Sequence, residues 1–223
     1  MTRNYDRAGD REALLTAILD HVPFDGWSES AFKIAAQDAG ISLERAMNAF
    51  PGGMAEVLAF YHESADRWMV EALLKEPLAD MKIREKVARA VRLRLEQNYA
   101  HREAVRSGCS FLMMPQHAPL AAKLLYKTVD AIWYAIGDRS TDFNFYTKRG
   151  LLAAVYSATV LYWLNDKSPD CAATWTFLDR RIQDVMLVPK AIAGLGKLAE
   201  RLPDPAKLFR RRFRPRQARG RSA

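Results

Sequence analysis

Apolar residues recur every three or four positions along most of this 223-residue chain, the spacing that lines one face of an α-helix. No stretch alternates apolar and polar residues as a half-buried β-strand would. The pattern predicts helices over residues 11–21, 28–39, 42–50, 54–74, 82–107, 120–137, 143–165, 170–188 and 189–202. We therefore expect an all-α protein, a helical bundle of about nine to ten helices.

Turn-forming residues separate the predicted helices. The sequence from Val22 to Gly26 contains Pro23 and predicts a break after the first helix. Ser28 and Ser42 are predicted N-caps, because a serine hydroxyl accepts a hydrogen bond from the first helical turn. Prolines at 115 and 119 are expected to bracket a turn before the helix over residues 120–137.

The predicted helices fall into three parts. Residues 11–53 form a three-helix part with the layout of a helix-turn-helix, residues 54–188 a helical body, and residues 189–223 an amphipathic helix with a basic tail. The first part resembles the N-terminal part of TetR-type regulators, including Phe50-Pro51-Gly52 after its short helix. That short helix offers Arg45 as its one cation, whereas DNA binding neutralises several phosphates. We expect no nucleic-acid partner.

Charge is concentrated at the C-terminal end of the chain. The net charge is +8, and residues 203–223 hold eight basic residues and one acid, which gives that segment +7 and leaves +1 for residues 1–202. The pI of about 9.6 therefore describes the tail and does not argue for nucleic-acid binding by the body.

No residue pattern predicts an enzyme. The two cysteines lack the spacing of a zinc site or a disulfide framework, and the four histidines lie outside any ExxH or HExxH motif. The sequence Ser30-Ala31-Phe32-Lys33 matches a catalytic S-x-x-K without its companion motifs. We expect no metal, no cofactor and no intrinsic catalysis; an enzyme would retain a metal or cofactor after purification.

The predicted helix over residues 189–202 carries an apolar stripe beside cations, and the basic tail follows it. This combination is typical of a helix that lies on an anionic membrane surface. A helix packed on the body, with a solvated tail, is the alternative. The predicted membrane-binding residues are Ile192, Leu195, Lys197, Leu198, Arg201 and Leu202.

A polar segment with clustered aromatic residues opens the most apolar helix. Thr141 or Asp142 can cap this helix, and Phe145 and Arg149 share one face because they are four residues apart. The segment is either the start of a capped core helix or a patch that binds a protein partner, since aromatic residues beside arginine are typical of interaction surfaces.

Several segments resemble the coenzyme Q biosynthesis protein nine family, the accessory lipid-binding proteins of ubiquinone synthesis. The resemblance covers about residues 11–190 and is carried by residues 21–28, 81–84, 142–149, 151–156, 168–170 and 174–182. The most specific segment reads Asp-Phe-Asn-Phe-Tyr-Thr-Lys-Arg at 142–149.

The resemblance implies a TetR-like fold, a homodimer formed through the C-terminal helices, and no DNA binding. It also implies a hydrophobic cavity for isoprenoid or another lipid, and assistance to the di-iron hydroxylase that acts on demethoxyubiquinone. The implied partner-binding residues are Asp142, Phe145, Tyr146, Thr147, Lys148 and Arg149. Because no presequence is recognisable, we expect a bacterial, cytoplasmic protein that is peripheral on the inner membrane.

Residues 54–188 are therefore predicted to form a lipid-binding and dimerisation body. Its candidate lipid-binding residues, for each of which ordinary core packing is the alternative, are Leu112, Met113, Leu124, Leu125, Ile132, Trp133, Val155 and Leu161. The predicted function is an accessory protein that binds isoprenoid lipid or phospholipid, docks on a membrane surface and presents substrate to the hydroxylase. A TetR-like transcriptional regulator with a lipid effector is the alternative.

Overall fold

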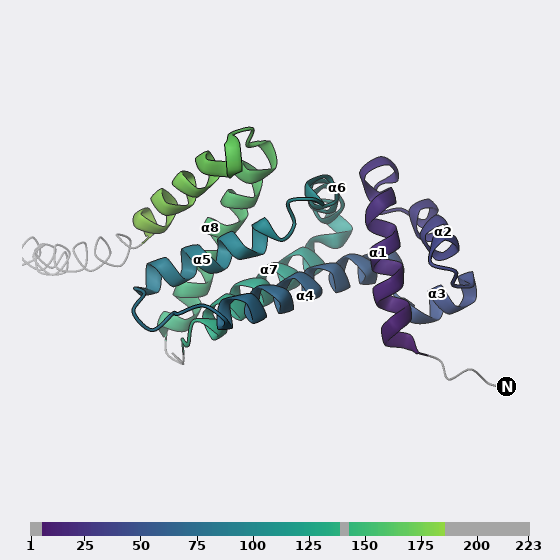
Figure 1. Cartoon of the computed structure of the whole chain (residues 1–223), viewed down its shortest axis with the longest axis horizontal. Coiled ribbons are helices and arrows are strands. Elements are labelled where there is room, and N and C mark those ends of the chain that lie inside the picture. The colour runs from purple at the N-terminus through teal and green to yellow at the C-terminus, as the bar shows by residue number, and fades with distance from the viewer. Residues whose placement is uncertain (1–5, 139–142, 186–223) are drawn as a thin grey trace, which may run out of the picture. The chain divides into compact units, whose positions relative to one another are not determined.

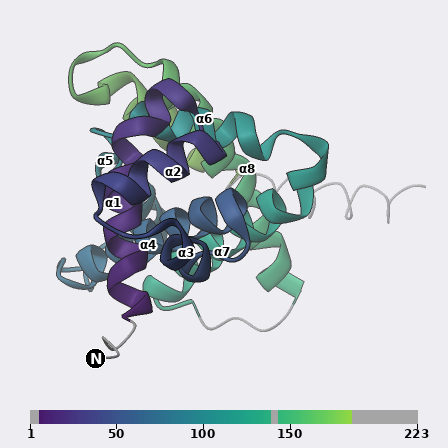
Figure 2. The ribbon, with the colours of Figure 1, turned by 90° about the vertical axis from the view of Figure 1, so that its right-hand side faces the viewer.

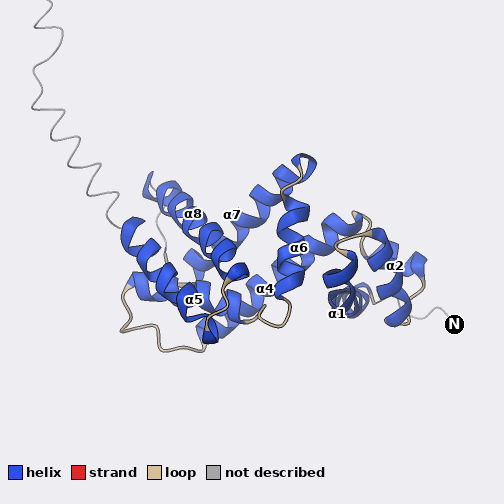
Figure 3. Cartoon of the chain, turned by 90° about the horizontal axis from the view of Figure 1, so that it is seen from above, coloured by secondary structure: helices blue, strands red, loops and turns tan. Residues whose placement is uncertain are grey.

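The computed structural model describes residues 6–138 and 143–185, and every regular element in these ranges is helical (Figures 1 and 3). The elements are α1 (Arg7–Asp25), α2 (Glu29–Asp38), α3 (Leu43–Ala49), α4 (Gly53–Leu74), α5 (Ile83–Glu96), α6 (Arg102–Leu112), the 3₁₀ turn η1 (Pro115–His117), α7 (Ala118–Ala135), α8 (Phe143–Asn165) and the 3₁₀ turn η2 (Pro169–Cys171). Residues 172–182 form a further helix, and residues 183–185, which belong to a separate unit, are helical too. The prediction of an all-α protein is confirmed.

Helices α1, α2 and α3 pack against one another at one end of the unit formed by residues 1–182 (Figures 1 and 2). Both predicted serine caps are confirmed. The Ser28 hydroxyl accepts a hydrogen bond from the Ala31 amide at 3.2 Å, and the Ser42 hydroxyl accepts one from the Arg45 amide at 3.3 Å. These caps fix where α2 and α3 begin. The apolar faces of the three helices share a core that includes Leu14, Ile18, Val22, Phe32 and Phe50.

The first helix ends within the predicted segment from Val22 to Gly26, but four residues later than predicted, because α1 runs through Pro23 to Asp25. Proline removes a single helical hydrogen bond, and a residue this close to the end of a helix can lose it without breaking the helix. The helix ends at Gly26 instead, which has a left-handed φ of 66° and donates its amide hydrogen to the Val22 carbonyl at 3.0 Å.

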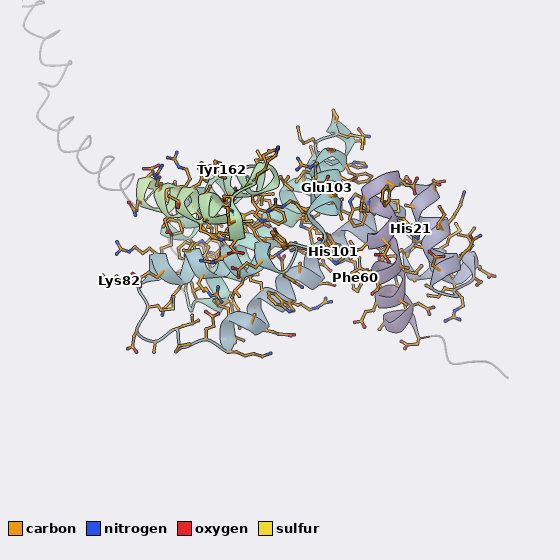
Figure 4. All side chains as sticks on the ribbon, turned by 45° about the horizontal axis from the view of Figure 1, so that its top comes forward. His21, Phe60, Lys82, His101, Glu103 and Tyr162 are labelled. Carbon is orange, nitrogen blue, oxygen red and sulfur yellow. The ribbon has the colours of Figure 1, made fainter. Side chains whose placement is uncertain are left out.

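The three-helix part is attached to the rest of the unit through α4 and α6. The indole Nε1 of Trp27 donates a hydrogen bond to the Ala104 carbonyl at 3.0 Å. Gly108 on α6 lies so close to Trp27 and Leu58 that a Cβ there would be 3.2–3.3 Å from both side chains. Phe60 on α4 receives the guanidinium of Arg11 over its ring at 4.5 Å, where α4 meets α1 (Figure 4).

The body is formed by α4, α5, α6, α7 and α8. Helix α4 packs against α5 and α7, and α8 packs against α6 and α7. The single helix predicted over residues 82–107 is wrong, because the chain leaves the helix at residues 97–101 and resumes it as α6. The reason is Asn98, whose side chain donates to the Arg94 carbonyl at 2.7 Å and accepts from the Tyr61 hydroxyl. An asparagine that bonds to its own backbone favours a turn over a helix.

The start of α7 differs from its prediction, whereas α8 begins and ends where it was predicted. Helix α7 begins at Ala118, so Pro119 lies inside its first turn rather than before it, a position where proline is tolerated. The predicted bounds of α8 are confirmed. Tyr162 on α8 (Figure 4) stacks on Phe177 with ring centroids 4.5 Å apart, which holds the helix over residues 172–182 against α8. The predicted helix over residues 189–202 and the basic tail lie outside the described residues.

Candidate functional site

A cavity of about 280 Å³ lies among the five helices of the body. Helices α4, α5, α6, α7 and α8 all contribute side chains to its wall. Most of the wall is apolar, and its apolar members include Leu95, Val105, Leu112, Leu124, Leu125 and Val160. The volume is near the lower limit of small-molecule sites in proteins.

Five of the eight predicted lipid-binding residues lie together on this wall: Leu112, Met113, Leu124, Leu125 and Leu161. The other three, Ile132, Trp133 and Val155, are buried but are not among the residues that line this cavity. On α7, the lining ends at Thr128, so Ile132 and Trp133 lie beyond the end of the cavity and pack in the core.

The two ends of the cavity differ in exposure. Met113 and Leu161 are 79% and 55% exposed, so they form a mouth at the protein surface. Tyr61, Arg94 and Asn98 are each less than 9% exposed, so they form an inner floor. The cavity therefore leads from an apolar mouth to a polar floor.

The floor is built around a buried ion pair. The Nε of Arg94 on α5 donates to the Asp66 carboxylate on α4 at 2.8 Å. The hydroxyl of Thr128 on α7 lies 3.0 Å from both oxygens of the same carboxylate. Three helices thus meet at one carboxylate, which satisfies a charge that burial would otherwise make costly.

The titratable side chains beside this ion pair are neutral. Burial, and to a smaller extent the charge of Arg94, lowers the pKa of His62 from 6.5 to about 3. Burial raises the pKa values of Tyr61 and Tyr156, although the charge of Arg94 opposes this shift. At neutral pH the floor therefore carries the opposite charges of Arg94 and Asp66 and no others from these groups.

Sequence reasoning missed the polar floor. Arg94 stands in an arginine-rich helix, and such a helix is typical of a solvated surface. One signal was available: Arg94 follows Val87, Ala90 and Val91 at helical spacing, and these are buried residues of the apolar face of α5. An arginine on an apolar stripe indicates a buried partner.

The segment at residues 142–149 divides into interior and surface positions. Arg149 is buried, with its guanidinium 2.7 Å from the Asp130 carboxylate and 3.4 Å from the centroid of the Phe145 ring. Tyr146 is 72% exposed. Lys148 forms an ion pair with Asp138 at 2.9 Å. The expectation of a surface arginine beside aromatic residues is therefore not met by Arg149, and Tyr146 is the exposed aromatic residue here.

The two remaining predicted positions of this segment are Asp142 and Thr147. Asp142 lies outside the described residues, and Thr147 is half-buried on α8. The predicted membrane-binding residues at 192–202 also lie outside the described residues.

In the helix-turn-helix-like part, the one cation of the short helix α3 is paired with an acid of the same part. Arg45 on α3 donates to both oxygens of Asp10 on α1, at 2.6 and 3.2 Å, and Asp10 is buried. The exposed apolar residues Leu43 and Met47 occupy the same short helix. Little positive charge is therefore available on α3 for phosphate groups.

Known proteins resemble this chain both in sequence and in fold. The COQ9 family model matches residues 118–189. The COQ9-B ubiquinone biosynthesis protein of Xenopus laevis is 32% identical over 197 residues, which cover 85% of this chain and 67% of that protein. The human protein, "Ubiquinone biosynthesis protein COQ9, mitochondrial", is 35% identical over 179 residues, which cover 78% of this chain.

The chain belongs to the COQ9 family. It spans 56% of the length of the human relative. A solved TetR transcriptional regulator from Nitrosomonas europaea matches the fold with a TM-score of 0.66 at 17% identity, covering 79% of this chain and 97% of that one. The TetR-like fold expected of a COQ9-family chain is confirmed.

Two further observations bear on what this COQ9-family site holds. Among the described residues, no group of three or more His, Cys, Asp or Glu side chains is arranged to hold a metal ion. No helix in the described ranges is long and apolar enough to cross a membrane.

Proposed function

We propose that this chain is a lipid-binding accessory protein of ubiquinone biosynthesis, with no reaction of its own. Its relatives are named ubiquinone biosynthesis proteins. The observation that carries the proposal is the apolar cavity among α4, α5, α6, α7 and α8, with Met113 and Leu161 exposed at its mouth.

The walls of the cavity suit a hydrocarbon chain. Each CH₂ group moved from water to an apolar site contributes about 0.8 kcal/mol. A few isoprene carbons inside the cavity are thus held without directional contacts, and the apolar mouth lets a longer chain continue outward.

The first experiment is native mass spectrometry of the purified protein, followed by lipid extraction. We expect a homodimer that carries isoprenoid or phospholipid. Ala121→Trp should abolish the bound lipid, because Ala121 lines the cavity and an indole would fill much of it. Ala122→Trp is the matched control, since Ala122 is exposed on the same helix and does not line the cavity. Lipid-free protein, or equal loss in both variants, would refute the proposal.

Membrane docking through residues 192–202 is the second element of the proposal. Leu198→Glu should weaken liposome flotation, because a carboxylate on the predicted apolar stripe opposes insertion into the interface. Ala193→Glu adds the same charge on the opposite face of the predicted helix and should have a smaller effect. Unchanged flotation of the Leu198 variant would remove the helix from this role.

Contact with a ubiquinone-pathway hydroxylase through the surface around Tyr146 is the third element. Tyr146→Ala should weaken the complex in a pull-down without unfolding the protein, since Tyr146 is exposed. Tyr126→Ala is the control, because Tyr126 is also exposed but lies on α7. Equal recovery of the hydroxylase with both variants would exclude Tyr146 from the contact.

A transcriptional regulator is disfavoured by the ion pair between Arg45 and Asp10. We expect no salt-dependent shift of DNA in a gel. A shift that disappears on Arg45→Ala would reverse this preference.

A further inference from the structure

Two aliphatic side chains are uncovered at one end of the body, where α4 ends and α5 begins. Leu74, the last residue of α4, is 67% exposed, and Ile83, the first residue of α5, is 63% exposed. Among the described residues, the other exposed Leu, Ile and Met side chains lie on α3 or beside the cavity mouth. We call residues 74–86 the α4–α5 corner. Since the body leaves Leu74 and Ile83 largely uncovered, both are available to an external surface.

The α4–α5 corner also carries positive charge that the protein does not neutralise. Three lysines form no ion pair within the described part of the chain: Lys75, Lys82 and Lys86. Two of the three acids at the corner are occupied. Arg89 donates to Glu76 at 2.6 Å, and the Glu85 carboxylate accepts a hydrogen bond from the Lys82 amide at 3.0 Å. The lysines therefore set the charge that the corner presents to a partner.

The last helix of the unit formed by residues 1–182 ends near this corner. Arg92 on α5 lies over the ring of Trp175 at 4.9 Å, so α5 packs beside the helix over residues 172–182. The two helices run in opposite directions (Figures 1 and 3), and Figure 4 shows Lys82 at the end where this helix stops. The predicted membrane-binding residues begin at Ile192, ten residues further on. Ten residues span at most about 35 Å, so one membrane is within reach of both.

An anionic membrane surface is the partner that this combination of side chains fits. Aliphatic side chains enter the boundary between headgroups and acyl chains, and lysines beside them contact anionic headgroups. A nucleic acid would use the lysines and leave Leu74 and Ile83 uncovered. The core of a protein interface is poor in lysine and rich in aromatic residues, whereas the corner holds lysines and no aromatic residue.

We propose that the α4–α5 corner is a second membrane-contact surface. Leu74 and Ile83 enter the interface, and the three lysines bind anionic headgroups. This inference rests on the proposed function, because it assumes that the protein docks on a membrane. It goes beyond docking through residues 192–202, since a second contact on the body fixes how the body is oriented on the membrane.

Flotation of the full chain with vesicles of phosphatidylcholine and phosphatidylglycerol tests the apolar contact. Ile83→Glu should lower the partition coefficient by on the order of tenfold. A carboxylate in the first turn of a helix is favourable, so thermal unfolding of this variant should match the parent. Met47→Glu is the matched control, because Met47 is 59% exposed and lies on α3. It should bind the vesicles as the parent does.

The lysines are tested with the same vesicles at low ionic strength. Lys82→Gln should lower the partition coefficient roughly fivefold, the effect of one cation near an anionic surface. Lys33→Gln is the control, because Lys33 is exposed on α2 and forms no ion pair with a residue that the structure describes. On vesicles of phosphatidylcholine alone, both variants should bind as the parent does.

The remaining outcomes separate the α4–α5 corner from membrane docking as a whole. If the parent does not float with the anionic vesicles, membrane docking fails, and the corner fails with it. If Leu198→Glu lowers flotation whereas Ile83→Glu behaves as Met47→Glu does, docking through residues 192–202 stands and the corner is overturned. Equal binding of Lys82→Gln and Lys33→Gln to the anionic vesicles would overturn the headgroup contact.

Discussion

Removal of the Asp66 carboxylate should be among the most destabilising single changes in the body. Asp66→Asn leaves the guanidinium of Arg94, which is 3% exposed, without a countercharge. Breaking a buried ion pair from one side destabilises a protein by about 3–5 kcal/mol. For a chain of this length, 1 kcal/mol shifts Tm by about 2–4 °C, so we expect a decrease of roughly 6–20 °C.

The exposed ion pair between Lys127 and Glu63 provides a matched control. Its atoms lie 2.6 Å apart, closer than the 2.8 Å between Arg94 and Asp66, but its side chains are 45% and 38% exposed. Glu63→Gln should therefore destabilise the protein by less than about 1 kcal/mol. Burial, and not distance, decides the difference between the two substitutions.

A double substitution separates the lost charge balance from lost packing. Asp66→Leu combined with Arg94→Met removes both charges and fills the space with apolar atoms, so most of the lost stability should return. We expect the double variant to remain about 1–2 kcal/mol less stable than the parent, because the Thr128 hydroxyl has lost its acceptor. Urea unfolding followed by circular dichroism at constant m value measures all three variants. Equal effects of Asp66→Asn and Glu63→Gln would refute the reasoning.

Three further substitutions test other parts of the unit. The pKa of His62 is lowered to about 3, so as pH falls below about 6.5 the unfolded state binds a proton before the folded state does. The free energy of unfolding of the parent protein, measured by urea titration, should therefore decrease by about 2 kcal/mol between pH 6.5 and 5. His62→Gln should abolish this decrease. Burial raises the pKa of Asp166, but hydrogen bonds from Thr174 and Ser168 outweigh this effect and lower it. Asp166→Asn should therefore destabilise the protein by about 1–2 kcal/mol at pH 7. The difference in unfolding free energy between parent and variant should shrink below about pH 4, as the carboxylate of the parent becomes protonated. Gly108→Val should destabilise the attachment of the three-helix part by about 1–3 kcal/mol, measured by thermal unfolding.

The parts of the fold that the sequence predicted are those governed by local rules. Ser28 and Ser42 bond to amides three residues away, so the starts of α2 and α3 follow from the sequence alone. Helix α8 has the predicted bounds because its apolar run, Leu151 to Leu164, is long and is interrupted only by Ser157 and Thr159. The break at residues 97–101 was missed because it depends on Asn98 meeting Tyr61, which is distant in the sequence.

The candidate site shows the same division between local and long-range information. Three of the five lining residues, Leu112, Leu124 and Leu125, are apolar positions on the inward faces of α6 and α7, which helical spacing indicates. The other two, Met113 and Leu161, line the cavity although they are largely exposed. Pattern alone did not separate a cavity wall from solid core, so Ile132, Trp133 and Val155 were grouped with them. The burial of Arg149 depends on Asp130 from another helix, and no local pattern of α8 contains that information.

The order of features along α8 connects the cavity with the proposed hydroxylase contact. Tyr146 precedes Tyr156 by ten residues and Leu161 by fifteen, which at 1.5 Å per residue is about 15 Å and about 22 Å along the helix. The polar floor is therefore nearer to the proposed hydroxylase contact than the mouth is. Between Tyr146 and Tyr156, α8 is tied to α7 by the ion pair of Arg149 with Asp130.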